Sequence, residues 1–139
     1  MKLRSAVLAI ALLLFAGTSV FAGQNPEKLA TEAAAGWLAL TDGGSYAASW
    51  DEAAQLFKNA VPKEDWARVL RANRAPLGEL MSRKLKSAKY MTEVPGAPDG
   101  QYVVIQFESS FKHKTKAVET ITPMLDQDGR WRVSGYFIK

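Results

Sequence analysis

The sequence predicts a single α+β domain in which three amino-terminal helices pack on one face of a curved, cone-like, four-stranded antiparallel meander sheet. Apolar residues recur at helical spacing from residue 29 to residue 70, and the period changes toward two after residue 78. Strong turn signals separate the runs that follow. The chain has 139 residues, of which residues 1–22 are expected to leave as a signal peptide. Residues 23–139 are then enough for one domain with one hydrophobic core.

The amino terminus has the three parts of a secretory signal peptide. Lys2 and Arg4 supply positive charge, residues 6–16 are apolar throughout, and residues 20–22 (Val-Phe-Ala) suit cleavage after Ala22. A membrane anchor is the alternative reading, but a spanning helix needs roughly 20 apolar residues, and residues 17–19 (Gly-Thr-Ser) interrupt this run. We therefore expect a protein of the periplasm or the extracellular space, with no membrane anchor after cleavage.

Three helices are expected before residue 78. Asn25 and Pro26 suit the N-cap and the first position of the first helix, which residues 42–44 (Asp-Gly-Gly) end. Ser45 caps a second helix, which runs to Val61 and carries an apolar stripe of Tyr46, Trp50, Ala53, Ala54 and Phe57. Of this stripe, Trp50 and Phe57 are expected to bury against the sheet. The third helix starts at Pro62 and ends before Pro76, and its inner face is marked by Trp66, Val69, Leu70 and Asn73.

Four strands are expected over residues 80–93, 102–111, 117–125 and 131–138. The turn signals between them are residues 95–100 (Pro-Gly-Ala-Pro-Asp-Gly), 112–114 (Lys-His-Lys) and 126–129 (Asp-Gln-Asp-Gly). Such short links favour an antiparallel meander. Gly135 is expected to mark a bulge or a bend in the last strand.

Composition excludes several kinds of chemistry. The chain has no cysteine, which rules out disulfides, thiolate metal sites and a thiol nucleophile. Its one histidine, His113, lies between two lysines in an expected turn, so no metal site is predicted, and no nucleotide motif or other cofactor signature occurs. The formal net charge of +4 falls to +2 when Lys2 and Arg4 leave with the signal, and the remaining bases are scattered. Nucleic acid is therefore not expected as a partner.

A linked set of sequence fragments spans almost the whole mature chain. They are Trp37, Asp42-Gly43-Gly44-Ser45-Tyr46 with Trp50, Arg74-Ala75-Pro76-Leu77-Gly78, Arg83, residues 95–102, Glu119-Thr120, and Trp131-Arg132-Val133 with Gly135-Tyr136-Phe137-Ile138. This set resembles the bacterial domain of unknown function 4019 family. The resemblance implies an exported bacterial protein without an assigned activity, and it supplies no catalytic residues. The order of helices and then a curved sheet also resembles the nuclear transport factor 2-like, or cystatin-like, fold, which hosts isomerases, dehydratases and binding modules alike.

A candidate ligand pocket is expected between the helices and the concave face of the sheet, lined by Tyr46, Trp50, Arg74, Glu119 and Tyr136. The first two lie one turn apart on a helix stripe, Arg74 ends a helix, and the last two lie in strands that a hairpin makes neighbours. A buried carboxylate needs a partner, so we expect Glu119 to pair with a base such as Arg83 or Arg132, or to stay protonated. The expected ligand is a small, partly apolar molecule with an anionic group for Arg74.

Three functions remain open from the sequence. It favours a non-catalytic exported binding domain for a small molecule or a protein partner. The alternative is a small cavity enzyme of isomerase or dehydratase type, with acid–base residues drawn from Tyr46, Tyr102, Tyr136, Asp42 and Glu119. A third reading is an interaction module without a cavity, whose sheet face or homodimer interface is the functional surface.

Overall fold

The computed structural model describes residues 25–139, so the predicted signal peptide and its cleavage site after Ala22 lie outside the described residues. Helices come first and a four-stranded antiparallel sheet follows, which confirms the predicted α+β fold class. In the part of the chain that the structure describes, no helix is both long enough and apolar enough to cross a membrane.

The first helix, α1 (Pro26–Asp42), begins where the sequence predicted. The Asn25 side chain accepts a hydrogen bond of 2.9 Å from the Glu27 N–H, and Pro26 occupies the first turn, where no backbone donor is needed. The helix ends at Asp42 with Gly43 as its C-cap, and Gly44 then takes a positive φ of 78° to reverse the chain. Its buried face carries Ala30, Ala34, Trp37, Leu38 and Thr41.

The predicted second helix is divided into two short helices, α2 (Tyr46–Asp51) and α3 (Gln55–Ala60). Between them the backbone of Ala54 is extended, and its N–H donates a 2.8 Å hydrogen bond to the Val133 carbonyl of the sheet. Ala53 and Ala54 are buried by this contact. The tertiary hydrogen bond and the burial of these two residues stabilise the fold more than a continuous helix would. Hydrophobic periodicity does not report such a tertiary contact.

The predicted inner face of the third helix is partly wrong. In α4 (Lys63–Arg74) the buried residues are Trp66, Leu70 and Arg74, spaced four apart, whereas Val69 is 49% exposed and Asn73 is also exposed. The stripe shifts because Arg74, not an apolar side chain, is drawn into the interior. A 3₁₀ turn, η1 (Ala75–Leu77), then leads to the sheet.

The sheet is a meander of β1 (Leu80–Met91), β2 (Tyr102–Phe111), β3 (Lys114–Leu125) and β4 (Trp131–Ile138). β2 and β4 match the expected ranges, while β3 starts three residues early, at Lys114 rather than residue 117. The β3–β4 register shifts between Thr122, opposite Gly135, and Pro123, opposite Val133, so Gly135 borders an irregularity, as predicted.

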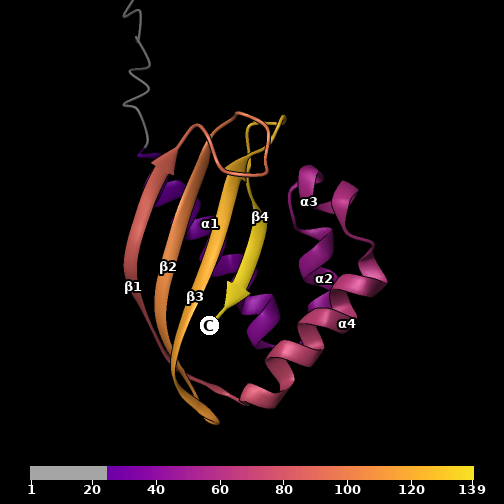
Figure 1. Cartoon of the computed structure of the whole chain (residues 1–139), viewed down its shortest axis with the longest axis vertical. Coiled ribbons are helices and arrows are strands. Elements are labelled where there is room, and N and C mark those ends of the chain that lie inside the picture. Colours follow the sequence, from indigo (N-terminus) through magenta and orange to yellow (C-terminus); the bar gives the residue numbers. More distant parts are fainter. Residues whose placement is uncertain (1–24) are drawn as a thin grey trace, which may run out of the picture.

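The helices lie on the inner face of the curved sheet (Figure 1). In this view α1 crosses behind the strands, and α4 stands across from β4, at the edge of the sheet. The core joins the inner residues of α1 and α4 to Val103, Ile105, Phe107, Ile121 and Val133 of the strands. Trp50 and Phe57 are only half-buried, at the rim of this core. They therefore lie less deep than the expected burial against the sheet.

Candidate functional site

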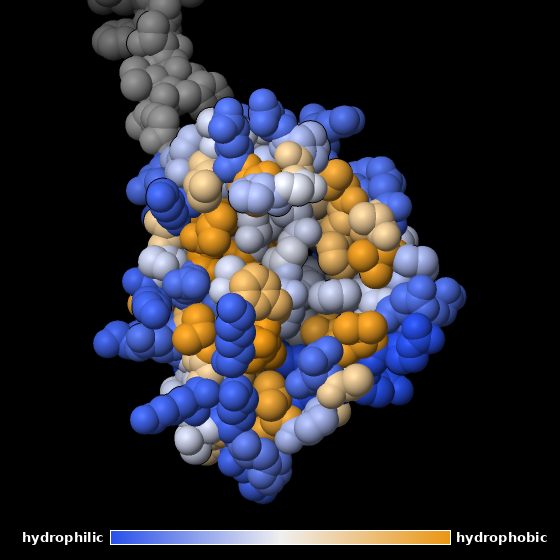
Figure 2. Space-filling model, viewed as in Figure 1, coloured by the Kyte–Doolittle hydropathy of each residue, from blue (hydrophilic) through white to orange (hydrophobic). Residues whose placement is uncertain are grey.

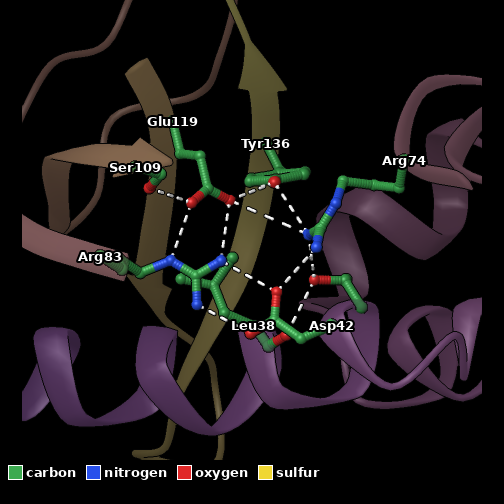
Figure 3. A network of polar contacts seen from close by, with 8 residues as sticks. Leu38, Asp42, Arg74, Arg83, Ser109, Glu119 and Tyr136 are labelled. Atoms are coloured by element: carbon green, nitrogen blue, oxygen red, sulfur yellow. Dashed lines mark hydrogen bonds and ion pairs between the residues drawn. The ribbon is translucent and has the colours of Figure 1, made fainter. Parts of the chain in front are cut away.

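A network of charged and polar side chains joins two helices to all four strands (Figure 3). Asp42 ends α1 and Arg74 ends α4, while Arg83, Glu119 and Tyr136 come from β1, β3 and β4. Side chains alternate between the two faces of a strand, so Glu119 faces inward with its neighbour Ile121, two positions along. The sheet thereby places a carboxylate opposite the carboxyl ends of two helices.

Glu119 is 0% exposed, and both of its oxygens are occupied. Arg83 binds it with both arms of the fork, Nε to Oε1 at 2.7 Å and Nη2 to Oε2 at 3.1 Å. The hydroxyl of Ser109 donates to Oε1, and the hydroxyl of Tyr136 donates to Oε2. Arg83 is one of the two partners that the sequence analysis expected for this carboxylate. The burial of Glu119 is offset by four hydrogen bonds and by ion pairs with Arg83 and, at 4.0 Å, with Arg74.

Asp42 connects the two arginines. Its Oδ1 accepts 2.8 Å from Arg74 Nη2 and 2.9 Å from Arg83 Nη2, and its Oδ2 accepts 2.8 Å from Arg83 Nη1. The side chain of Arg74 is 3% exposed, and that of Asp42 is 22% exposed. Two guanidinium groups therefore face two carboxylates, and the charges of the network balance.

Burial alone would raise the pKa of Asp42, but its hydrogen bonds to Arg83 and Arg74 outweigh burial and hold that pKa below its usual value. The same contacts raise the pKa values of both arginines against the opposing effect of burial. Burial, together with the neighbouring Glu119, strongly raises the pKa of Tyr136. Tyr136 is therefore a protonated donor at neutral pH, not a base.

Arg74 keeps one nitrogen unpaired. Its Nη1 donates to Thr41 Oγ1 at 3.0 Å and to the Tyr136 hydroxyl at 3.4 Å. Its buried Nε has no hydrogen-bond partner among the described residues. The guanidinium carbon lies 4.7 Å from the centre of the Phe111 ring, so a cation–π contact adds to the ion pair that holds the charge.

The five residues predicted for a ligand pocket do not come together. Arg74, Glu119 and Tyr136 meet inside the network, whereas Tyr46 and Trp50 lie at the rim of the core. Trp50 donates its indole N–H to the Val61 carbonyl at 2.7 Å, and Tyr46 lies 5.9 Å from the Arg71 guanidinium. The binding role of these five residues stays a prediction.

The residue of α2 that turns inward is Ser49. Its hydroxyl accepts from the indole N–H of Trp66 at 3.0 Å, and its carbonyl accepts from that of Trp37 at 2.8 Å. With Ser49 facing these indoles, Tyr46 and Trp50 of the same short helix are held at the rim of the core.

Sequence reasoning missed Asp42, Ser109 and Thr41 as members of the network. Asp42 was interpreted as a turn residue at a helix end or as an acid–base candidate, whereas in the structure it binds Arg83 across 41 positions of the chain. The one local signal for Ser109 is its place on the inward face of β2, where the neighbouring residues are apolar. Among residues 25–139 no three His, Cys, Asp or Glu side chains gather closely enough to hold a metal ion.

A groove of about 530 Å³ lies between α4 and the second half of β4. Figure 2 shows this region as a hollow between the sheet and the helices, with apolar residues on both flanks. The wall on α4 includes Trp66, Val69 and Leu70, and the wall on β4 includes Tyr136 and Ile138. Tyr136 thus belongs to both places, since its hydroxyl closes the buried network while the residue lines the groove.

A model of a protein family described as "Protein of unknown function (DUF4019)" matches residues 33–136. No curated protein and no solved structure matches the chain. The resemblance to the nuclear transport factor 2-like fold stays a prediction.

Proposed function

Because the chain belongs to the DUF4019 family, whose description assigns no activity, we propose from the geometry that it is an exported, non-catalytic binding domain with its ligand site in the α4–β4 groove. The observation that carries this proposal is the complete pairing of the buried carboxylate beside an open, largely apolar groove.

The pairing of Glu119 argues against the cavity-enzyme alternative. Acid–base catalysis needs a carboxylate or a phenol that can reach the substrate and exchange a proton with it. Glu119 has no exposed surface, and Arg83, Ser109 and Tyr136 hold its oxygens. The raised pKa of Tyr136 keeps its proton in place. These groups support a structural role for the network, which ties helices to strands.

The lining of the groove supports a partly apolar ligand. Trp66, Val69 and Leu70 offer apolar surface, and Lys114 and Lys139 are the charged residues of the lining. Arg74 was expected to bind the ligand's anionic group, but Asp42 already neutralises it, at 2.8 Å. The two lysines are better placed to attract an anion. The proposal of export rests on the sequence of residues 1–22.

The proposal is tested with anilinonaphthalene sulfonate, an apolar anionic probe whose fluorescence rises when it leaves water. We expect the purified protein to raise the probe's fluorescence and Val69→Glu to reduce that rise at least five-fold, because residue 69 is a rim residue of the groove. The matched control is Leu85→Glu on β1, since Val69 and Leu85 are 49% and 48% exposed.

Equal losses in the two variants would mean that the probe binds exposed apolar residues in general. No rise with the unaltered protein would remove the groove as a binding site for this class of molecule. Far-ultraviolet circular dichroism of both variants checks that the fold is kept.

A further inference from the structure

The two edges of the sheet differ in their protection against pairing with another strand. The β1 edge carries Lys84, Lys86 and Lys89, and its register with β2 shifts twice, between Leu80 and Ser82 and between Leu85 and Ser87. Lysines and bulges are the usual means by which an exposed edge avoids a further strand. The segment 134–138 of β4 has the sequence Ser-Gly-Tyr-Phe-Ile, with no charge and no proline. The edge beside the groove is thus the less protected one.

Backbone groups of β4 point to this open edge. Lys139 and Val118 exchange both of their hydrogen bonds, at 3.0 and 2.9 Å, and Phe137 lies opposite Thr120 in the same register. In an antiparallel pair the intervening residues turn their N–H and C=O groups the other way. Tyr136 and Ile138 therefore present four backbone groups to the outer edge.

The start of the same edge already has a partner. The Val133 carbonyl accepts the N–H of Ala54, at 2.8 Å, so the link between α2 and α3 covers β4 there. Beyond that point, no backbone hydrogen bond from another described element reaches Tyr136 or Ile138. Instead the groove follows this part of the edge, and α4 forms its opposite wall.

The charges of the groove indicate the chemistry of the occupant. Of its lining residues, Lys114 and Lys139 are cationic and none is acidic. A ligand with acidic groups at that end is therefore complementary. A small apolar anion would satisfy the lysines but not the row of backbone donors and acceptors, whereas a peptide satisfies both.

We propose that β4 binds an extended, acidic peptide segment of a partner protein, which adds to the sheet as a fifth strand in the α4–β4 groove. Backbone hydrogen bonds to Tyr136 and Ile138 give affinity, and the apolar wall and the lysines select the side chains. This inference rests on the proposed function, because it takes the groove as the ligand site. A second copy of the chain fits less well, since β4 itself has no Asp or Glu to meet the lysines.

The test selects octapeptides from a random display library on the immobilised full protein and synthesises those that are enriched. We expect acidic peptides with alternating apolar residues. Methylation of the peptide's backbone nitrogens, one at a time, should weaken binding at least ten-fold at every second position and little at the positions between. This period of two is the signature of a strand that pairs along one edge.

Variants of the protein test the same contact from the other side. Ile138→Pro removes an N–H that points to the groove and leaves the bonds to β3 in place, and it should weaken binding at least ten-fold. Lys139→Glu should weaken the binding of acidic peptides by a similar factor without changing the backbone hydrogen bonds. Lys86→Glu, on the other edge, makes the same change of charge and should leave affinity within two-fold.

Urea denaturation of each variant separates loss of binding from loss of fold, and if Ile138→Pro unfolds, the peptide methylation series and Lys139→Glu decide. The proposal is overturned if no peptide is enriched, if methylation shows no period of two, or if the free protein is a dimer through β4 that peptides do not dissociate. If peptide methylation shows no period of two but Val69→Glu still reduces the probe's fluorescence, strand addition is refuted and the groove remains a binding site. Loss of both effects would refute the proposed function as well.

Discussion

At the scale of single residues, the burial of Glu119 imposes the strictest condition on its neighbours. A carboxylate without exposed surface is tolerated because Arg83 and two hydroxyl groups compensate for its lost hydration. The alternation of β3 makes the inward direction of Glu119 predictable, and the need for a basic partner follows from burial. Burial alone does not predict whether Arg83 or Arg132 is that partner. In the structure Arg132 instead binds Asp128 in the β3–β4 hairpin, at 2.7 Å.

Removing Arg83 should therefore be costly. Arg83→Met removes the cation that binds Glu119 through two hydrogen bonds and leaves it only Arg74, at 4.0 Å, so we expect the free energy of unfolding to fall by about 3–5 kcal/mol. The double variant Arg83→Met with Glu119→Gln should lose less than the single one. Urea denaturation provides the measurement, and Arg68→Met is the control, because Arg68 pairs with Asp65 on the surface with 75% of its side chain exposed. A surface pair of that kind contributes about 0–1 kcal/mol, so equal losses at the two sites would contradict this account.

Asp42 should give the network a dependence on acid. Its arginine partners hold its pKa below the ordinary value of 3.8, so its contribution to stability is fully present above that pH and is lost as the pH falls through the folded-state value. We expect Asp42→Asn to be less stable than the unaltered protein at pH 7, with the difference shrinking below about pH 4. Urea midpoints measured from pH 7 to pH 2.5 check this. A difference that stays constant over that range would show that Asp42 acts through packing and not through its charge.

At the scale of elements, the sequence predicts the features that local signals determine and misses those that depend on long-range contacts. Turn residues and alternation predicted the ranges of β2 and β4 correctly because the determinants lie within the segment. The break between α2 and α3 was not predictable in this way, since it depends on a hydrogen bond from Ala54 to Val133, 79 positions later. The candidate site suffered from the same limit. Its predicted residues come from four elements, and Tyr46 and Trp50 were chosen by helical phase alone.

The junction between η1 and β1 gives an element-scale prediction. Gly78 has a φ of 75°, and a Cβ there would lie 2.8 Å from Cδ2 of His113 at the tip of the β2–β3 hairpin. Gly78→Ala should lower stability by more than about 1 kcal/mol, because it adds strain to a close approach. Gly36→Ala in α1, where a Cβ meets nothing within 4 Å, should raise stability by about 0.5–1 kcal/mol. Thermal or urea unfolding of the pair should show opposite signs, and a shared sign would contradict the geometry.

At the scale of the whole molecule, the fold class and the family agree with the sequence analysis, and export remains to be tested. Among the described residues, the helices and the sheet leave a groove at the β4 edge, and a balanced charge network lies beside it, with Tyr136 in both. Composition could not predict this division. The same arginines and carboxylates would also suit an exposed anion site if their pairing were different.

Export predicts a shortened chain. Intact-mass measurement of the periplasmic fraction of the producing bacterium should give a protein that starts at Gly23, because residues 20–22 suit signal cleavage. The control is a variant with Ala22→Tyr, which should retain the longer chain in the membrane fraction. Finding the unaltered protein there from Met1 to Lys139 would refute the prediction.

The positions of the network residues along the chain also determine when their contacts can form during synthesis. Asp42 leaves the ribosome early, but Arg83, Glu119 and Tyr136 of the same network follow 41, 77 and 94 positions later along the chain. Until β3 and β4 exist, the helices have only the β1–β2 half of the sheet to cover, and Arg83 lacks the buried carboxylate of Glu119. A nascent chain of this kind holds few native long-range contacts to unravel before its last strand is made. That delay would suit the export predicted from residues 1–22, in which the polypeptide passes through a membrane channel unfolded.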